Sequence, residues 1–104
     1  MANTRSAPRQ RRRFRVTLGH TTVFTVDVGP GGFAADIMRA LPTGTPVAGT
    51  LRLNGADVDY AGQVAWARAG DPHLNLPGRI GVRFERPPRE VHRLLQSSSL
   101  GNVG

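Results

Sequence analysis

Residues 47–67, VAGTLRLNGADVDYAGQVAWA, decide the fold predicted for this chain. β-Branched and aromatic residues lie on both sides of a central Asn54-Gly55, so Val47 to Leu53 and Val58 to Ala67 are predicted strands. Asn-Gly is the dipeptide best suited to a two-residue type I′ turn, because both of its residues tolerate positive φ. The centre of the chain therefore predicts a long antiparallel hairpin.

The segments on either side extend this hairpin into a sheet. Downstream, Arg79 to Glu85 alternates apolar with other residues, which is typical of a half-buried antiparallel strand. Upstream, Phe14 to Asp27 predicts two short strands that turn at Gly19-His20, and Phe33 to Ile37 predicts a further strand. Many short strands with regularly spaced turn signals are typical of a small antiparallel barrel or sandwich.

A short helix is predicted at the end of the sheet. After Pro87-Pro88, the stretch Arg89 to Gln96 places its apolar residues at helical spacing, and these are Val91, Leu94 and Leu95. We expect a flexible basic arm over residues 1–10, one domain over residues 11–96 and a disordered tail over residues 97–104.

Length and composition limit the class of protein. The 104 residues suffice for one small domain, and the absence of cysteine excludes disulfides and cysteine-held metals. There is neither an apolar run of the ~20 residues that cross a bilayer nor an apolar stretch behind the basic N-terminus that would make a secretory signal. We therefore expect a soluble, cytoplasmic protein without a membrane partner, as a monomer or weak dimer.

The positive charge is concentrated in one place. The formal net charge is +7, all 14 basic residues are Arg, and six of them lie in the first fifteen residues, which contain no acid. A charge this localised favours one compact anionic ligand over an extended nucleic acid. A nucleic-acid binder would also need exposed aromatic residues for base stacking, whereas all four candidates are predicted in the core: Phe24, Phe33, Phe84 and Trp66.

Catalytic motifs are missing from the sequence. The three His lie far apart without metal-ligand spacing, and there is no nucleophile elbow, phosphate-binding GK[ST] loop or GxGxxG that opens a helix. Asp57 and Asp59 are predicted to face solvent on a hairpin strand rather than to form a catalytic pair. We expect a binding protein, not an enzyme, with no cofactor and no metal.

Two segments carry groups that suit an anionic nucleotide. Arg11 and Arg15 are four residues apart where the first strand begins, and guanidinium stacks on bases and forks onto phosphate oxygens or guanine O6 and N7. Asp27 opens a glycine-rich loop, where a carboxylate can accept a base N–H and backbone amides can approach an anion. The three glycines predict positive φ in that loop. Taken separately, the arginines also fit a solvated basic tail, and the loop also fits an ordinary hairpin turn.

Four motifs in order resemble the PilZ domains, a family of receptors for the bacterial second messenger cyclic di-GMP. The family pattern is RxxxR, then (D/N)xSxxG, then strands of the types GxVxW and GVRF, and finally a helix. The matching stretches are Arg11-Arg12-Arg13-Phe14-Arg15-Val16, Asp27-Val28-Gly29-Pro30-Gly31-Gly32-Phe33, Gly62-Gln63-Val64-Ala65-Trp66 and Ile80-Gly81-Val82-Arg83-Phe84. The resemblance covers roughly residues 9–96 and implies an all-β fold, a six-stranded antiparallel β-barrel with a short C-terminal helix.

The resemblance also implies roles for single residues. Arg11 and Arg15 would hold guanine edges and phosphates, Asp27 would contact a guanine edge, and Gly32 would fix the turn. Arg12 and Trp66 are secondary candidates, Trp66 by stacking on a base.

Position 29 departs from the family pattern, because Gly29 stands where the family usually has Ser. The loss of one hydrogen bond there predicts a roughly two- to twelve-fold weaker affinity.

Two functions follow from the resemblance. The first is a cyclic di-GMP receptor that relays the signal to an unidentified effector protein by a conformational change. The alternative is an adaptor that does not bind nucleotide and acts by protein–protein interaction, for example in motility or polarity control. Gly29 and the short spacing of eleven residues between Arg15 and Asp27 favour the adaptor. Convergence of Arg11, Arg15 and Asp27 on one face would favour the receptor.

The RxxxR motif can be placed in two registers. Arg9 and Arg13 form a second RxxxR, but Phe14 and Val16 favour the register of Arg11 and Arg15.

Overall fold

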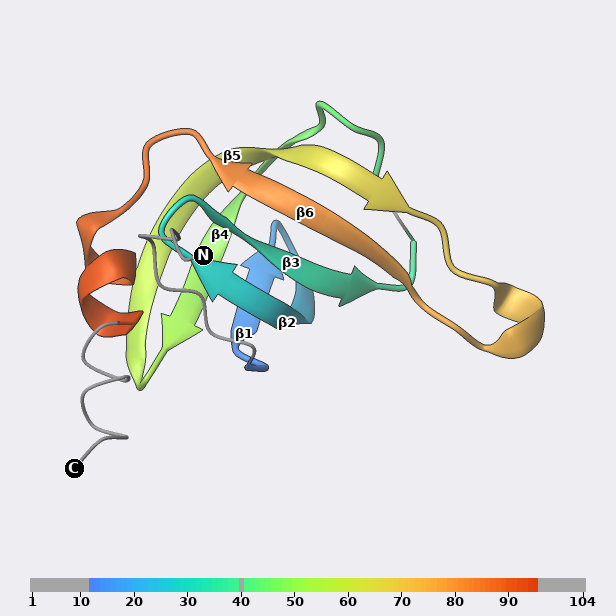
Figure 1. Cartoon of the computed structure of the whole chain (residues 1–104), viewed down its shortest axis with the longest axis horizontal. Helices are drawn as coiled ribbons and strands as arrows, with labels where there is room; N and C mark the ends of the chain where they lie inside the picture. Colours follow the sequence, from blue (N-terminus) through green and yellow to red (C-terminus); the bar gives the residue numbers. More distant parts are fainter. Residues whose placement is uncertain (1–11, 40, 96–104) are drawn as a thin grey trace, which may run out of the picture.

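The computed structural model describes residues 12–39 and 41–95 of the chain. In these ranges the backbone forms six strands, a single 3₁₀ turn and a C-terminal helix over residues 89–95 (Figure 1). The named elements are β1 (Arg15–Leu18), β2 (Thr21–Gly29), β3 (Gly32–Ile37), β4 (Pro46–Leu53), β5 (Ala56–Arg68), η1 (Pro72–Leu74) and β6 (Gly78–Phe84). The strands predicted from Phe33 onward begin and end within two residues of the observed bounds.

The six strands close into an antiparallel barrel. Their order is β1-β2-β3-β6-β5-β4, and β1 meets β4 at the pair Val16 and Leu51. The C-terminal helix lies at one end of the barrel (Figure 1), where Val91 and Leu95 are fully buried. The predicted fold, a six-stranded antiparallel barrel with a short C-terminal helix, is confirmed.

The β4–β5 hairpin has the predicted turn, whereas the glycine-rich loop does not use the predicted backbone conformation. Asn54 and Gly55 both have positive φ, 51° and 87°, as a type I′ turn requires. The positive-φ glycines of the described residues are Gly19, Gly44 and Gly55, so the expectation of positive φ in the loop after Asp27 is wrong. Gly32 instead has no room for a side chain, because a Cβ there would overlap the carbonyl oxygen of Val82 on β6.

Three rings form the centre of the core. Phe33 contacts Tyr60 edge-to-face at 5.3 Å between ring centroids and Phe84 at 6.1 Å, while Tyr60 and Phe84 are 5.9 Å apart. Phe33 and Phe84 are therefore core residues, as predicted. The prediction that Phe24 and Trp66 also lie in the core is wrong, because their side chains are 43% and 45% exposed.

The register of β2 explains the exposure of Phe24. Val23 and Thr25 are both buried, so the residue between them points outward. The run Val23, Phe24, Thr25, Val26 does not alternate in polarity, and the sequence therefore did not reveal which side of this strand faces the core.

Tyr60 is expected to make the barrel sensitive to alkaline pH. Its hydroxyl donates to the Thr17 carbonyl oxygen at 2.6 Å, and burial raises the pKa of Tyr60 well above its ordinary value. The folded barrel then binds more protons than the unfolded chain from about pH 10 upward, so stability present below pH 10 is lost as pH rises, by at most about 1.4 kcal/mol per pH unit.

Urea denaturation between about pH 8 and pH 11 measures this loss. The chain has one Tyr and contains neither Lys nor Cys, so no other side chain titrates in this range. At about pH 8, Tyr60→Phe is expected to be about 1 kcal/mol less stable than the original chain, and its stability should not fall as the pH rises. An equally steep decline in both proteins would contradict the assignment.

Candidate ligand-binding site

Two β-bulges turn the predicted ligand residues outward. The pairing of β2 with β3 shifts between Thr25 and Asp27, and the pairing of β5 with β6 shifts between Val64 and Trp66. A bulge adds one residue to a strand and so reverses which face the following side chain takes. Trp66 would point into the core by simple alternation from the buried Val64, and the bulge puts it on the outer face instead.

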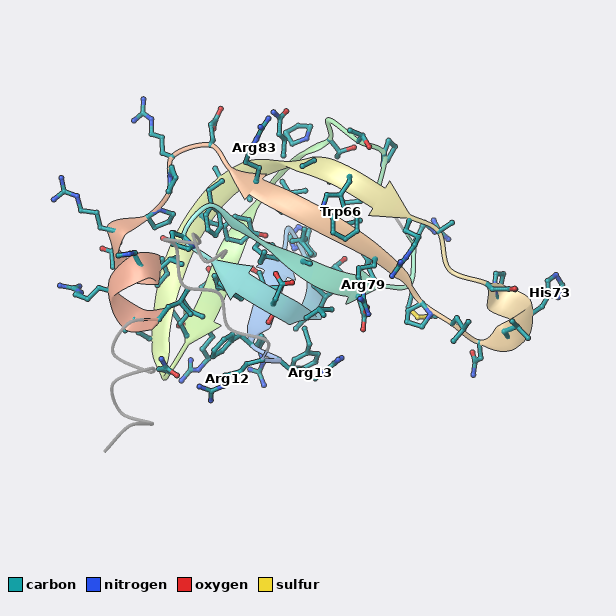
Figure 2. The ribbon with its side chains drawn as sticks, viewed as in Figure 1. Arg12, Arg13, Trp66, His73, Arg79 and Arg83 are labelled. Atoms are coloured by element: carbon teal, nitrogen blue, oxygen red, sulfur yellow. The ribbon has the colours of Figure 1, made fainter. Side chains whose placement is uncertain are left out.

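Asp27 and Trp66 belong to one row of residues that runs across four strands. The paired positions are Asp27, Ala34, Gly81 and Trp66, on β2, β3, β6 and β5 in turn. The two central residues are small, and a Cβ at Gly81 would overlap the indole of Trp66, so the ring lies across the β6 backbone. Figure 2 shows Trp66 over β6. The row is therefore a flat floor with a carboxylate at one end and an indole at the other.

A hollow of about 290 Å³ lies on this row. It brings together three predicted residues, Asp27, Gly32 and Trp66, and adds Arg83. Gly32 pairs with Gly29 on one side and with Arg83 on the other, so the backbone of Arg83 lies one strand away from the loop that lacks the family's Ser. Sequence reasoning missed Arg83, although its outward position follows from the alternation of β6.

The arginines at the start of β1 line a second hollow. This open hollow of about 660 Å³ contains Arg12, Arg13, Arg15, Phe24 and Arg52. Arg15 pairs with Phe24 across β1 and β2, so Arg15 and Asp27 lie on neighbouring strands but in separate hollows. Arg11 lies outside the described residues.

Arg13 connects the start of the barrel to β3. Its guanidinium lies 3.7 Å from the Asp36 carboxylate and 6.0 Å from the centre of the Phe24 ring. Arg79 donates to the same carboxylate at 2.9 Å. Sequence reasoning considered Arg13 only in the second RxxxR with Arg9 and did not consider Arg79. The contacts of both with Asp36 join residues that are distant in the sequence. These contacts hold two guanidinium groups against one carboxylate on the outer face, next to Phe24.

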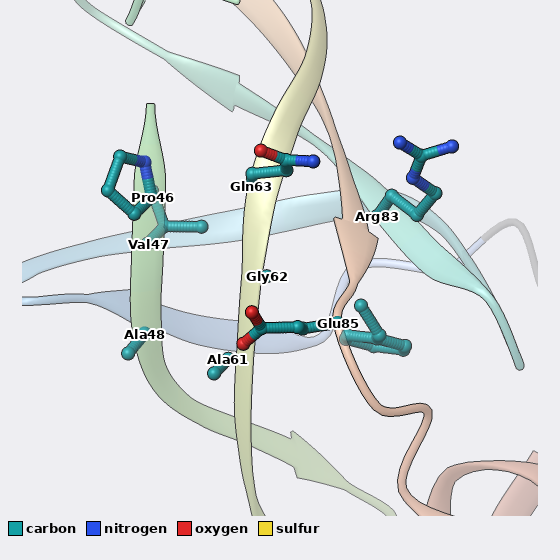
Figure 3. A pocket seen from close by; sticks show the side chains of 9 residues that line it. Pro46, Val47, Ala48, Ala61, Gly62, Gln63, Arg83 and Glu85 are labelled. Atoms are coloured by element: carbon teal, nitrogen blue, oxygen red, sulfur yellow. The ribbon is translucent and has the colours of Figure 1, made fainter. Parts of the chain in front are cut away.

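A third hollow, of about 550 Å³, lies on the neighbouring face over β4 and β5 (Figure 3). Its floor includes Ala48 and Ala61, and Figure 3 shows the Glu85 carboxylate extending over β5. A carboxylate there repels phosphate, and Arg83 at the margin is the one cation of this lining. This hollow is therefore a poor site for an anionic nucleotide.

The described residues contain no group of three His, Cys, Asp or Glu side chains that could hold a metal ion. Among the same residues, no helix has the length and apolar character needed to cross a membrane.

Comparison with known proteins identifies the family. The family model for the PilZ domain matches residues 3–101. The chain belongs to the PilZ domain family. Among curated protein sequences, none is significantly similar to this PilZ domain.

A solved structure supports the fold. The PilZ domain superposes on the Bacillus subtilis inhibitor of motility, MotI/DgrA, with a TM-score of 0.77 and 12% sequence identity. The match covers 96% of this chain and 53% of that protein, so the chain spans about half the length of MotI/DgrA.

Thr25 positions the arginines of this PilZ domain. Its buried hydroxyl accepts the Phe14 N–H at 2.8 Å and donates to the Arg12 carbonyl at 2.6 Å. The Thr25 N–H donates to the Phe14 carbonyl at 2.9 Å. These bonds set the direction in which the chain enters β1.

Thr25→Val is expected to lower the free energy of unfolding by about 1–3 kcal/mol, because the change leaves the Phe14 N–H and the Arg12 carbonyl without the hydroxyl that they bond. Urea denaturation measures the loss. Thr22→Val, an exposed position on the same strand, is the matched control and should change stability little. Equal stability of the two variants would show that Thr25 does not hold the start of the barrel.

Proposed function

We propose that this PilZ domain binds cyclic di-GMP on the outer face of β2, β3, β6 and β5, and relays the signal to an effector protein by a conformational change. The observation that carries the proposal is the row from Asp27 to Trp66, with Arg83 beside it. It combines a carboxylate, a flat aromatic ring and a guanidinium in one hollow.

Each group of the site suits a part of the nucleotide. The Asp27 carboxylate can accept the two N–H donors of one guanine edge, and the Trp66 ring can stack on a base face. Arg15, with Arg11 from the preceding segment, can donate to guanine O6 and N7 or to phosphate. We assign Arg83 to a phosphate, in place of the hydroxyl that Gly29 lacks. Gly32 keeps β3 close to β6 so that these groups meet.

The size of the hollows suggests how the ligand would lie. Small-molecule sites usually measure about 300–1,000 Å³, so the hollow of about 290 Å³ at Asp27 is too small to enclose a dinucleotide. A ligand that also contacts the hollow of about 660 Å³ at Arg15 would follow β2 from Asp27 to Phe24, which lines that second hollow. The two Arg–guanine contacts, at about 1–3 kcal/mol each, and the phosphate contacts together can supply the roughly 8 kcal/mol of micromolar binding.

A second candidate function is an adaptor that binds protein without nucleotide. Gly29 and the separation of Arg15 from Asp27 into two hollows favour it. In either case the proposed activity is binding, with no reaction catalysed.

The deciding experiment is isothermal titration calorimetry of the purified chain with cyclic di-GMP at ~0.15 M salt, with GTP and cyclic di-AMP as controls. Micromolar or tighter binding that is selective for cyclic di-GMP, and is lost when Arg11 and Arg15 are both changed to Ala, supports the receptor. Trp66 is the one Trp of the chain, so quenching of its fluorescence on binding reports stacking. Absence of binding up to about 100 μM would refute the receptor and leave the adaptor.

Arg83→Ala tests the assignment of Arg83 to a phosphate. The variant is expected to bind cyclic di-GMP about tenfold more weakly, because a hydrogen bond to a charged group is worth at least about 1.5 kcal/mol. The same titration measures the change. Arg86→Ala, at an exposed position two residues beyond the end of β6, is the control and should leave the affinity unchanged. Equal affinity of the Arg83 variant and the original chain would remove Arg83 from the site.

A further inference from the structure

The exposed large apolar side chains of the described residues form two groups. Phe24 and Trp66 lie on the proposed nucleotide face, whereas Met38, Leu74 and Leu76 are 82%, 65% and 54% exposed elsewhere. Leu74 and Leu76 belong to residues 69–77, which connect β5 to β6 and which we call the β5–β6 lobe. Figure 1 shows this lobe, with η1 at its tip, projecting beyond the ends of the two strands.

The lobe is held in shape by its own backbone rather than by apolar packing. Asp71 and Leu76 exchange two backbone hydrogen bonds, of 3.0 and 2.9 Å, which close its neck. The Asp71 carboxylate accepts the His73 N–H at 3.0 Å and caps η1, and Asn75 ends η1 in the left-handed conformation. No residue of η1 is buried. The two leucines therefore contribute little to folding, and the lobe presents them in a preformed geometry.

An apolar cleft lies where the lobe meets the end of β3. This cleft of about 340 Å³ is lined by Met38 from the β3 end and by Pro72 and Leu76 from the lobe, among other residues. Exposed apolar side chains that gather around a cleft are typical of protein-binding surfaces. Leu74 does not line the cleft, but it is exposed on η1 in the same lobe, between Pro72 and Leu76 in the sequence.

The charges around the lobe define the partner. Asp71 is the one acidic residue in residues 69–77, and the segment contains no Arg. Exposed arginines border the surface, because Arg39 follows Met38 and Arg68 precedes the lobe. Acidic side chains would complement this border. In a second copy that docked through the same surface, Arg39 and Arg68 would face arginines, which repel them. The lobe also lacks Trp, Tyr and Phe, the residues that anchor proteins at membrane surfaces.

We propose that the β5–β6 lobe and Met38 form the docking surface for the effector protein, a partner that sets apolar side chains into the cleft and acidic residues against Arg39 and Arg68. This inference rests on the relay in the proposed function, and names its output surface. The lobe connects β5 and β6, the two strands that carry Trp66 and Arg83. The proposed nucleotide site and the docking surface therefore share these strands.

Site-specific photo-crosslinking in the cells that make the protein identifies the partner. A benzophenone amino acid replaces Leu74 in one full-length chain and His92, an exposed residue of the C-terminal helix, in a control chain. One crosslinked protein at position 74 that is absent at position 92 is expected. That protein is then purified and titrated with the unlabelled chain.

The titration decides whether the lobe binds the partner. Leu74→Ser with Leu76→Ser is expected to weaken binding at least ~10-fold, whereas Leu74→Met with Leu76→Met should stay within ~3-fold, because Met keeps the apolar surface. Arg68→Glu and added salt should each weaken binding. The Ser double variant should remain folded and bind cyclic di-GMP as the original chain does.

Several results would overturn the proposal. One is that the partner crosslinks equally well at positions 74 and 92. Another is that position 74 crosslinks to a second copy of the chain. A third is that the Ser double variant binds the partner with unchanged affinity. Flotation with phosphatidylglycerol vesicles that is abolished by the Ser double variant would assign the lobe to a membrane instead. If the chain binds no cyclic di-GMP but the partner still requires Leu74 and Leu76, the nucleotide proposal fails while the docking surface stands.

Discussion

Alanine at both Arg15 and Asp27 is expected to weaken the binding of cyclic di-GMP at least ~100-fold. An Arg–guanine contact is worth about 1–3 kcal/mol, and a hydrogen bond to a charged carboxylate about 1.5–3 kcal/mol. The two residues line separate hollows, so their losses should add. The combined loss of about 2.5–6 kcal/mol has its middle well above the roughly 2.7 kcal/mol that corresponds to a factor of 100.

Calorimetric titration of the double variant, the two single variants and two controls measures this effect. Asp27→Asn keeps one oxygen acceptor and matches the family pattern, so it should lose less affinity than Asp27→Ala. Arg89→Ala removes an exposed positive charge from the C-terminal helix and should change the affinity by less than ~2-fold. A double variant that binds within ~5-fold of the original chain would show that the ligand does not touch the proposed face.

Phe33→Ala is expected to lower the free energy of unfolding by about 3–5 kcal/mol, because the change leaves a large cavity in the core. Phe33 is 2% exposed and its ring contacts both other members of the aromatic cluster, Tyr60 and Phe84. Small domains have a total stability of about 5–15 kcal/mol. The variant should therefore lose a large fraction of the total stability of the barrel and unfold at a much lower urea concentration than the original chain.

Urea denaturation followed by far-ultraviolet circular dichroism measures the loss. Phe24→Ala on the neighbouring strand is the matched control, since Phe24 is 43% exposed and lies beneath Arg13. Its truncation should cost less than about 1.5 kcal/mol, because little apolar surface is removed from a packed interior. Similar losses in the two variants would contradict the assignment of Phe33 to the centre of the core.

Burial of the aromatic residues could be predicted from the sequence for some strands but not for others. The alternation of β6 correctly placed Val82 and Phe84 in the core, because β6 pairs regularly over most of its length with β3. The same reasoning put Trp66 in the core, because the bulge after Val64 leaves no mark in the order of apolar residues. A prediction of burial by alternation holds only as far as the next bulge.

The candidate site divides in the same way. Asp27, Gly32 and Trp66 were recognised from motifs, and the structure brings them into one hollow. Arg83 was recognised as a site residue only from the structure, where it pairs with Gly32. The contacts of Arg13 with Asp36 and Phe24 likewise join residues that no local pattern connects.

The strands, the Asn54-Gly55 turn, the C-terminal helix and the family resemblance could be predicted from the chain, since alternation, turn chemistry and motifs are local properties. The folded barrel was needed to see that Asp27 and Trp66 share an outer face, that Arg15 lies in a separate hollow and that the β5–β6 lobe exposes two leucines. The physical reason is that bulges and close approaches such as that of Gly81 to Trp66 depend on how distant strands pack against one another, and a strand read alone does not contain that information.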